Sequence, residues 1–131
     1  MSYVSTNVSD LLGLVLKKIT NDGYEIDFET DNGELFRMLH HQDCCENVRV
    51  EEIIGDLDDL IGSPILIAEE RTSSANGDPN VWECGTWTFY EFATNKGSVT
   101  IRWLGTSNGY YSESVDFVQV TNKKSSRLQS H

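Results

Sequence analysis

The densest group of residues able to do chemistry lies at residues 40–46, where the chain reads His-His-Gln-Asp-Cys-Cys-Glu. Imidazole, thiolate and carboxylate groups are the ligands that zinc takes in proteins. Neighbouring residues of an extended chain point to opposite sides, so each adjacent pair supplies about one ligand. The candidates for a metal site are His41, Cys44 and Cys45. The spacing matches no standard zinc pattern, and a tight loop in which Asp43 accepts backbone hydrogen bonds accounts for the same residues.

The same seven residues also offer a thiol beside an imidazole, the pair used in nucleophilic catalysis. A reactive cysteine needs surroundings that stabilise the thiolate. Here Asp43 and Glu46 flank the two cysteines, and their negative charges disfavour it. A metal- or thiol-dependent enzyme is therefore one interpretation of this loop. No resident cofactor and no catalytic residue are predicted.

A second segment of interest, residues 105–112, reads Gly-Thr-Ser-Asn-Gly-Tyr-Tyr-Ser. Asn108 begins a turn signal, because Asn-Gly tolerates the backbone of tight turns. Tyr110 and Tyr111 follow it and offer flat contacts to a base or to a protein surface. In the alternative, one tyrosine packs on the sheet and the other faces water.

Two arginines, Arg37 and Arg102, stand near the ends of strands that lead into these two segments. A guanidinium is a forked donor suited to the phosphate of a small ligand. The alternative is a surface salt bridge with one of the many carboxylates of the chain. Arg37, Arg102, His41, Asp43, Asn108, Tyr110 and Tyr111 are the predicted ligand- or partner-binding residues.

The elements that position these residues form a pattern that occurs twice. Asp-Leu-Leu-Gly at 10–13 is answered by Asp-Leu-Ile-Gly at 59–62, and the segment 28–33 is answered by 92–97. The pattern predicts pseudo-repeats over 10–53 and 59–120, with Phe28 and Phe92 at corresponding core positions and Gly33 and Gly97 in turns. Two similar hairpins in an ordinary β-meander would give the same pattern.

The halves diverge at residues 40–46 and 105–112, so we expect function in these loops. The hypothesis is that the two loops form one shared surface, within a monomer or across a subunit contact. A homo-oligomer is therefore compatible with the sequence.

Secondary structure is predicted to be mainly β, or α+β, as an antiparallel meander of about seven or eight strands. Residues 24–28 alternate apolar and polar side chains, which is the period of a half-buried strand, and Asn32-Gly33 follows as a hairpin turn. Helix is expected only as short turns near 8–12 and 56–61. Trp103 is assigned to the core. A single domain over 1–121 and a flexible polar tail over 122–131 complete the prediction.

Composition narrows the classes of function. The chain has 131 residues and a formal net charge of −11, which disfavours direct binding to DNA because phosphates would be repelled. No apolar run reaches the roughly 20 residues of a membrane-spanning helix. The N-terminus lacks a secretory signal, and three cysteines cannot all pair within the chain. A cytoplasmic location is expected.

Long runs of the chain are similar to a family of small domains of unknown function encoded by bacteriophages and prophages. The runs that carry the resemblance are 41–46, 55–65, 88–94, 100–103 and 105–115. The resemblance covers most of residues 11–117 and gives no chemical role to any residue. It implies a small viral accessory protein made in the cytoplasm of an infected bacterial cell.

Three functions follow from charge, loops and resemblance. The first is a non-enzymatic inhibitor that binds a bacterial defence protein through an acidic surface. The second is a sponge for a cyclic or other nucleotide immune signal. The third is the metal- or thiol-dependent enzyme at the His-Gln-Asp-Cys-Cys segment.

Overall fold

The computed structural model describes residues 2–42, 46–76, 84–107 and 112–121, and these residues contain nine strands. The strands are β1 (Ser2–Ser5), β2 (Leu16–Asn21), β3 (Glu25–Thr30), β4 (Leu35–Leu39), β5 (Asn47–Ile54), β6 (Ile67–Ser74), β7 (Cys84–Thr94), β8 (Gly97–Ser107) and β9 (Asp116–Thr121). Two short 3-10 turns, η1 (Val8–Leu11) and η2 (Leu57–Leu60), are the helical elements of the described residues. The predicted mainly-β class and both helical turns are confirmed.

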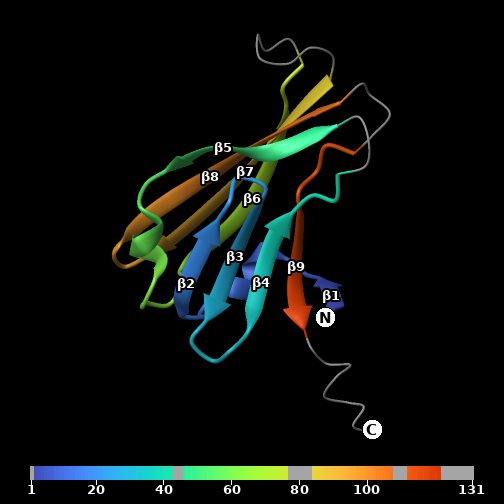
Figure 1. Cartoon of the computed structure of the whole chain (residues 1–131). Coiled ribbons are helices and arrows are strands. Elements are labelled where there is room, and N and C mark those ends of the chain that lie inside the picture. The colour runs from blue at the N-terminus through green and yellow to red at the C-terminus, as the bar shows by residue number, and fades with distance from the viewer. Residues whose placement is uncertain (1, 43–45, 77–83, 108–111, 122–131) are drawn as a thin grey trace, which may run out of the picture.

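The strands form two antiparallel sheets that face each other and cross obliquely (Figure 1). The five-stranded sheet has the order β1-β9-β4-β3-β2, and the four-stranded sheet has the order β5-β8-β7-β6. Each sheet contains a three-stranded meander from one half of the chain. In the five-stranded sheet, β9 from the second half of the chain pairs with β4 from the first. In the four-stranded sheet, β5 from the first half pairs with β8 from the second.

The core lies between the two inner faces. Its largest side chains alternate along the strands with outward-facing residues, as period-two patterning requires. Phe28 and Phe92 are both fully buried, with ring centroids 5.6 Å apart, and Trp103 is also fully buried. An aromatic pair of this kind adds about 0.5–1.5 kcal/mol beyond the area that it buries. The prediction that Trp103 belongs to the core is confirmed.

The segments that follow the two short turns pair through reciprocal backbone contacts. The Gly13 amide donates to the Ile65 carbonyl at 2.8 Å, and the Gly62 amide donates to the Leu16 carbonyl at 2.9 Å. Both glycines have positive φ angles, 83° and 89°, which side chains rarely adopt. Leu11 and Leu60, one from each turn, are fully buried beneath them. The arrangement is what an internal duplication predicts, and the duplication itself stays a prediction.

Several details differ from the sequence prediction. Strand β1 was not predicted, because four residues with mostly exposed side chains give no alternating pattern. Strand β6 continues to Ser74 although its last residues are polar, since an edge strand can be polar on both faces. Gly97 is the first residue of β8 rather than a turn residue, whereas Gly33 does lie in a turn. The predicted tail, 122–131, lies outside the described residues. The described part contains no helix long and apolar enough to cross a membrane.

Candidate functional site

Three of the seven predicted binding residues lie in described parts of the chain. Arg37 lies on β4, His41 follows the end of that strand, and Arg102 lies on β8 in the other sheet. The remaining predicted positions lie outside the described residues, as do two of the metal candidates. These positions are Asp43, Cys44, Cys45, Asn108, Tyr110 and Tyr111.

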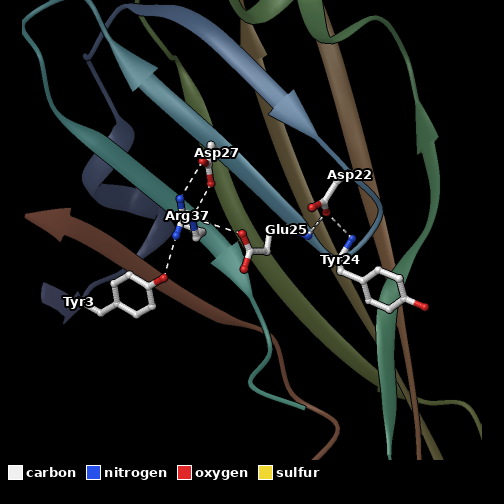
Figure 2. Close-up of polar contacts among 6 residues, drawn as sticks. All are labelled: Tyr3, Asp22, Tyr24, Glu25, Asp27 and Arg37. Atoms are coloured by element: carbon white, nitrogen blue, oxygen red, sulfur yellow. Dashed lines mark hydrogen bonds and ion pairs between the residues drawn. The ribbon is translucent and has the colours of Figure 1, made fainter. Parts of the chain in front are cut away.

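Arg37 is held by a carboxylate from the neighbouring strand. Asp27 on β3 is the direct register partner of Arg37, so both side chains leave the same outer face of the five-stranded sheet. The Arg37 Nε donates to Asp27 Oδ1 at 2.6 Å, and Nη2 donates to Oδ2 at 2.9 Å (Figure 2). Glu25 adds a second carboxylate, with Oε1 3.7 Å from Nε. The predicted alternative, a salt bridge, is therefore what Arg37 makes.

Tyr3, on β1, completes the surroundings of this guanidinium. Arg37 Nη1 donates to the Tyr3 hydroxyl at 2.7 Å, and the Tyr3 ring stacks on His41 with centroids 6.0 Å apart. The hydrogen bonds that Arg37 donates to Asp27 raise the pKa of Arg37 well above its ordinary value. Arg37 therefore stays charged and joins three strands. Sequence reasoning missed Tyr3, because an isolated aromatic residue in a short N-terminal segment carries no pattern.

A small hollow opens beside Asp27, at the end of the β2–β3 hairpin. Its volume is about 130 Å³, and it is lined by Thr20, Asn21, Asp22, Glu25 and Asp27. The Asp22 carboxylate accepts hydrogen bonds from the Tyr24 amide at 2.9 Å and the Glu25 amide at 2.7 Å (Figure 2). These backbone hydrogen bonds lower the pKa of Asp22, so its negative charge is present over a wide pH range.

The hairpin end that carries this hollow is fixed against the other sheet. The Val50 amide of β5 donates to the Gly23 carbonyl at 2.8 Å. Tyr24, the next residue, keeps 48% of its surface exposed, and Tyr3 keeps 41%. We call the surface formed by Tyr3, Asp22, Tyr24, Glu25, Asp27 and Arg37 the acidic face. Its hollow is lined by three carboxylates, which can hold a cationic group.

Arg102 lies on the opposite outer surface and does not contribute to the acidic face. Its guanidinium pairs with Glu52 of β5 and lies 4.6 Å from the centroid of the Trp87 ring. Phe89 lies two residues after Trp87 on β7, and its ring centroid is 5.9 Å from the same guanidinium. Structure therefore separates two arginines that the sequence places at matching positions.

The described ends of the two divergent loops do meet. His40 Nδ1 lies 2.7 Å from the Ser114 carbonyl, and His40 Nε2 lies 3.0 Å from Glu46 Oε2. The His40 and Glu46 side chains are almost fully buried. Glu113 accepts a hydrogen bond from Thr86 Oγ1 at 2.7 Å and folds over Gly105, where an added Cβ would lie 2.4 Å from the Glu113 carbonyl. The contact between His40 and Ser114 is the one that joins the described ends of the two loops.

Within the described ranges, no three or more His, Cys, Asp or Glu side chains gather in a way that could hold a metal ion. The predicted metal candidates Cys44 and Cys45 are not among the residues to which this finding applies. The carboxylates of the acidic face are fixed in place by backbone amides and by Arg37.

Comparison with known proteins gives one match. A family model described as "Domain of unknown function (DUF7448)" matches residues 9–117. No curated protein and no solved structure matches the chain. The matched range includes Arg37, Asp27 and the β2–β3 hairpin, whereas Tyr3 lies before it.

Proposed function

The chain belongs to the DUF7448 family, and we propose that it is a non-enzymatic binding protein whose acidic face engages a basic surface of another protein. The observation that carries the proposal is the hollow lined by Asp22, Glu25 and Asp27. One neighbouring arginine, Arg37, offsets only part of this charge. A partner's lysine or arginine side chain is the complement of such a site.

Exposed tyrosines support a protein as the partner. Tyr3 and Tyr24 lie at opposite ends of the group of carboxylates, and both are exposed large hydrophobic residues (Figure 2). Tyrosine is enriched where proteins bind each other, because it offers a rigid flat surface and one polar atom. A free metal ion or a small cation would not need these two rings.

The resemblance to phage-encoded domains supplies the class of partner in this proposal. The partner is a bacterial defence protein that itself holds nucleic acid and therefore has a basic surface. The chain, with a net charge of −11, inhibits it by occupying that surface in the cytoplasm of the infected cell. Electrostatic attraction then accelerates association and makes it sensitive to salt.

The nucleotide-sponge alternative receives less support from the described residues. Arg37 is bonded through two nitrogens to Asp27, and Arg102 is paired with Glu52. A nucleotide phosphate would have to displace these carboxylates from either guanidinium. The predicted contribution of Tyr110 and Tyr111 to such a site falls outside the described residues, so that part of the alternative stays a prediction.

The test compares two double variants with equal loss of charge. Asp22→Asn with Glu25→Gln removes two charges from the acidic face and leaves Asp27 to hold Arg37. Glu69→Gln with Glu91→Gln removes two charges from directly paired positions of the other sheet. Each chain is expressed in a bacterium that carries one defence system, and phage plaques are counted. The defence protein is then purified, and its affinity for each chain is measured by calorimetry.

We expect the acidic-face variant to lose about tenfold or more in affinity, since charge-complementary pairs at an interface are each worth a kcal/mol or more. The control variant should protect the phage like the wild type. Equal binding by both variants, or binding that is insensitive to salt, would show that the acidic face is not the contact surface.

A further inference from the structure

Strand β1 is attached to the rest of the protein by few contacts. It is the edge strand of its sheet and pairs with β9 over four residues, from Ser2 opposite Thr121 to Ser5 opposite Val118. Residues 3–5 are exposed. Such a strand opens at a low free-energy cost, because little apolar surface leaves water when it docks.

One side chain anchors this strand beyond its backbone ladder. The Tyr3 hydroxyl accepts from Arg37 Nη1 at 2.7 Å, and its ring stacks on His41. After β1, the Thr6 amide donates to the Phe117 carbonyl at 3.1 Å. The chain then enters η1, in which Val8 and Leu11 are buried, so the core holds the protein again only from that point.

The side chains that anchor Tyr3 lie within the range matched by the family, whereas the backbone ladder of β1 lies outside it. The matched range, 9–117, contains Arg37 and His41, but neither β1 nor its register partners on β9, residues 118–121. When β1 leaves, β9 presents a row of free backbone groups, which is a template for another strand.

We propose that the β9 edge is a strand-binding site in which β1 of a second copy replaces the chain's own β1, so that two copies exchange their N-terminal strands. The incoming segment has the same sequence, so every contact of the closed monomer forms again in the exchanged dimer. The balance between the two forms is then set by protein concentration and by the short connection at Thr6 and Asn7.

Exchange would place a residue of one copy in the acidic face of the other. Tyr3 of the second copy would then accept the hydrogen bond from Arg37. The dimer would hold two acidic faces in one particle, and a partner with two basic surfaces would bind it more tightly than a single copy. The inference does not rest on the proposed function, because exchange can be measured without any partner.

Cysteine trapping tests the exchange in the full chain. Ser5→Cys is made in one preparation and Val118→Cys in another, since these residues are register partners. The two preparations are mixed under native conditions and oxidised mildly. Strand exchange yields a disulfide-linked dimer in the mixture, seen as a species of twice the chain mass. Each variant alone is the control for reactions of the native cysteines.

A second pair guards against unfavourable geometry at the first. Val4→Cys and Gln119→Cys are the next register partners and point to the other face of the ladder. In both mixtures, Tyr3→Ala should make the cross-linked dimer form faster, because β1 opens more often without the side chain that anchors it. Failure of both mixtures to exceed their single-variant controls overturns the proposal, as does an equal rate of dimer formation with and without Tyr3.

Discussion

Each outer face of the sandwich is organised around one arginine, yet the two faces differ in character. Arg37 on β4 is surrounded by two carboxylates and a tyrosine hydroxyl, and its side chain is 16% exposed. Arg102 on β8 has one carboxylate and lies over two aromatic rings, and its side chain is 29% exposed. The same residue type therefore supports a polar, acidic surface on one sheet and an aromatic one on the other.

The difference shows that total charge does not locate a binding surface. The net charge of −11 belongs to the whole chain. What distinguishes the first face is the geometry around Arg37 and Asp22, which fixes carboxylates in place and leaves Tyr3 and Tyr24 exposed. On the second face, Glu52 balances Arg102 and the rings of Trp87 and Phe89 are partly covered. Removing one carboxylate partner of each arginine in turn tests whether the two faces differ in this way.

The largest effect is expected when the bidentate partner of Arg37 is removed. Asp27→Ala leaves a mostly buried guanidinium whose one remaining carboxylate is Glu25 at 3.7 Å, and it should cost about 2–3 kcal/mol of unfolding free energy. The matched change on the other face, Glu52→Ala, should cost only about 0.5 kcal/mol, because the side chains of that ion pair are more exposed, 29% for Arg102 and 49% for Glu52. Urea denaturation of both variants measures the difference. Equal costs would mean that the two arginines are held alike.

The next effect in size tests whether the two faces act independently. Trp87 packs against Leu104 and Ala75 and receives the Arg102 guanidinium over its ring. Trp87→Ala should therefore destabilise the chain by about 2 kcal/mol through lost packing and cation–π contact. Binding through the acidic face should not change at temperatures where the variant is folded. Calorimetric titration against the purified partner checks this, and a matching loss of affinity would show that the faces are coupled.

Much of the five-stranded sheet could be predicted from the sequence. Residues 24–28 alternate and Asn32-Gly33 closes the turn, so β3 and β4 follow from local pattern alone. The register of this hairpin also identifies the partner of Arg37, because Asp27 lies directly opposite Arg37 across the turn. No local sequence signal places β5 in the four-stranded sheet and β9 in the five-stranded sheet, because each placement depends on which distant strand offers a free edge.

The candidate site was only partly predictable. The sequence selected Arg37 and His41 but linked them to residues 43 and 108–111, which lie outside the described residues. Tyr3, which contacts both, could not be found because its strand has four residues and no alternation. Asp22 is not among the residues that the sequence selected. It is a fixed carboxylate because the Tyr24 and Glu25 amides donate to it, and the sequence alone does not show these contacts.

A smaller effect should separate the hydroxyl of Tyr3 from its ring. Tyr3→Phe removes the acceptor for Arg37 Nη1 and keeps the ring that stacks on His41. Because Arg37 retains Asp27, we expect a loss of about 0.5–1 kcal/mol in unfolding free energy. Hydrogen exchange of the β1 and β9 amides should report faster opening of this edge. Unchanged exchange would mean that the backbone ladder alone holds β1.

The smallest effect concerns the pH dependence of Asp22, which has no counterpart among the described residues around Arg102. Backbone hydrogen bonds from Tyr24 and then Glu25 lower the pKa of this carboxyl in the folded chain, and partial burial opposes them. A lowered folded-state pKa means that the ionised carboxylate stabilises the fold fully above its unfolded pKa of about 4. That contribution is lost as the pH falls through the lower folded value.

Asp22→Asn keeps an oxygen acceptor for the turn but cannot titrate, so its stability difference from the wild type isolates this carboxyl. We expect a difference of at most about 0.5 kcal/mol at neutral pH, because the group is mostly exposed, shrinking below about pH 4. Urea denaturation of both chains from neutral to acid pH measures this stability difference. A difference that stayed constant across the range would contradict the view that the ionised Asp22 carboxylate stabilises the turn.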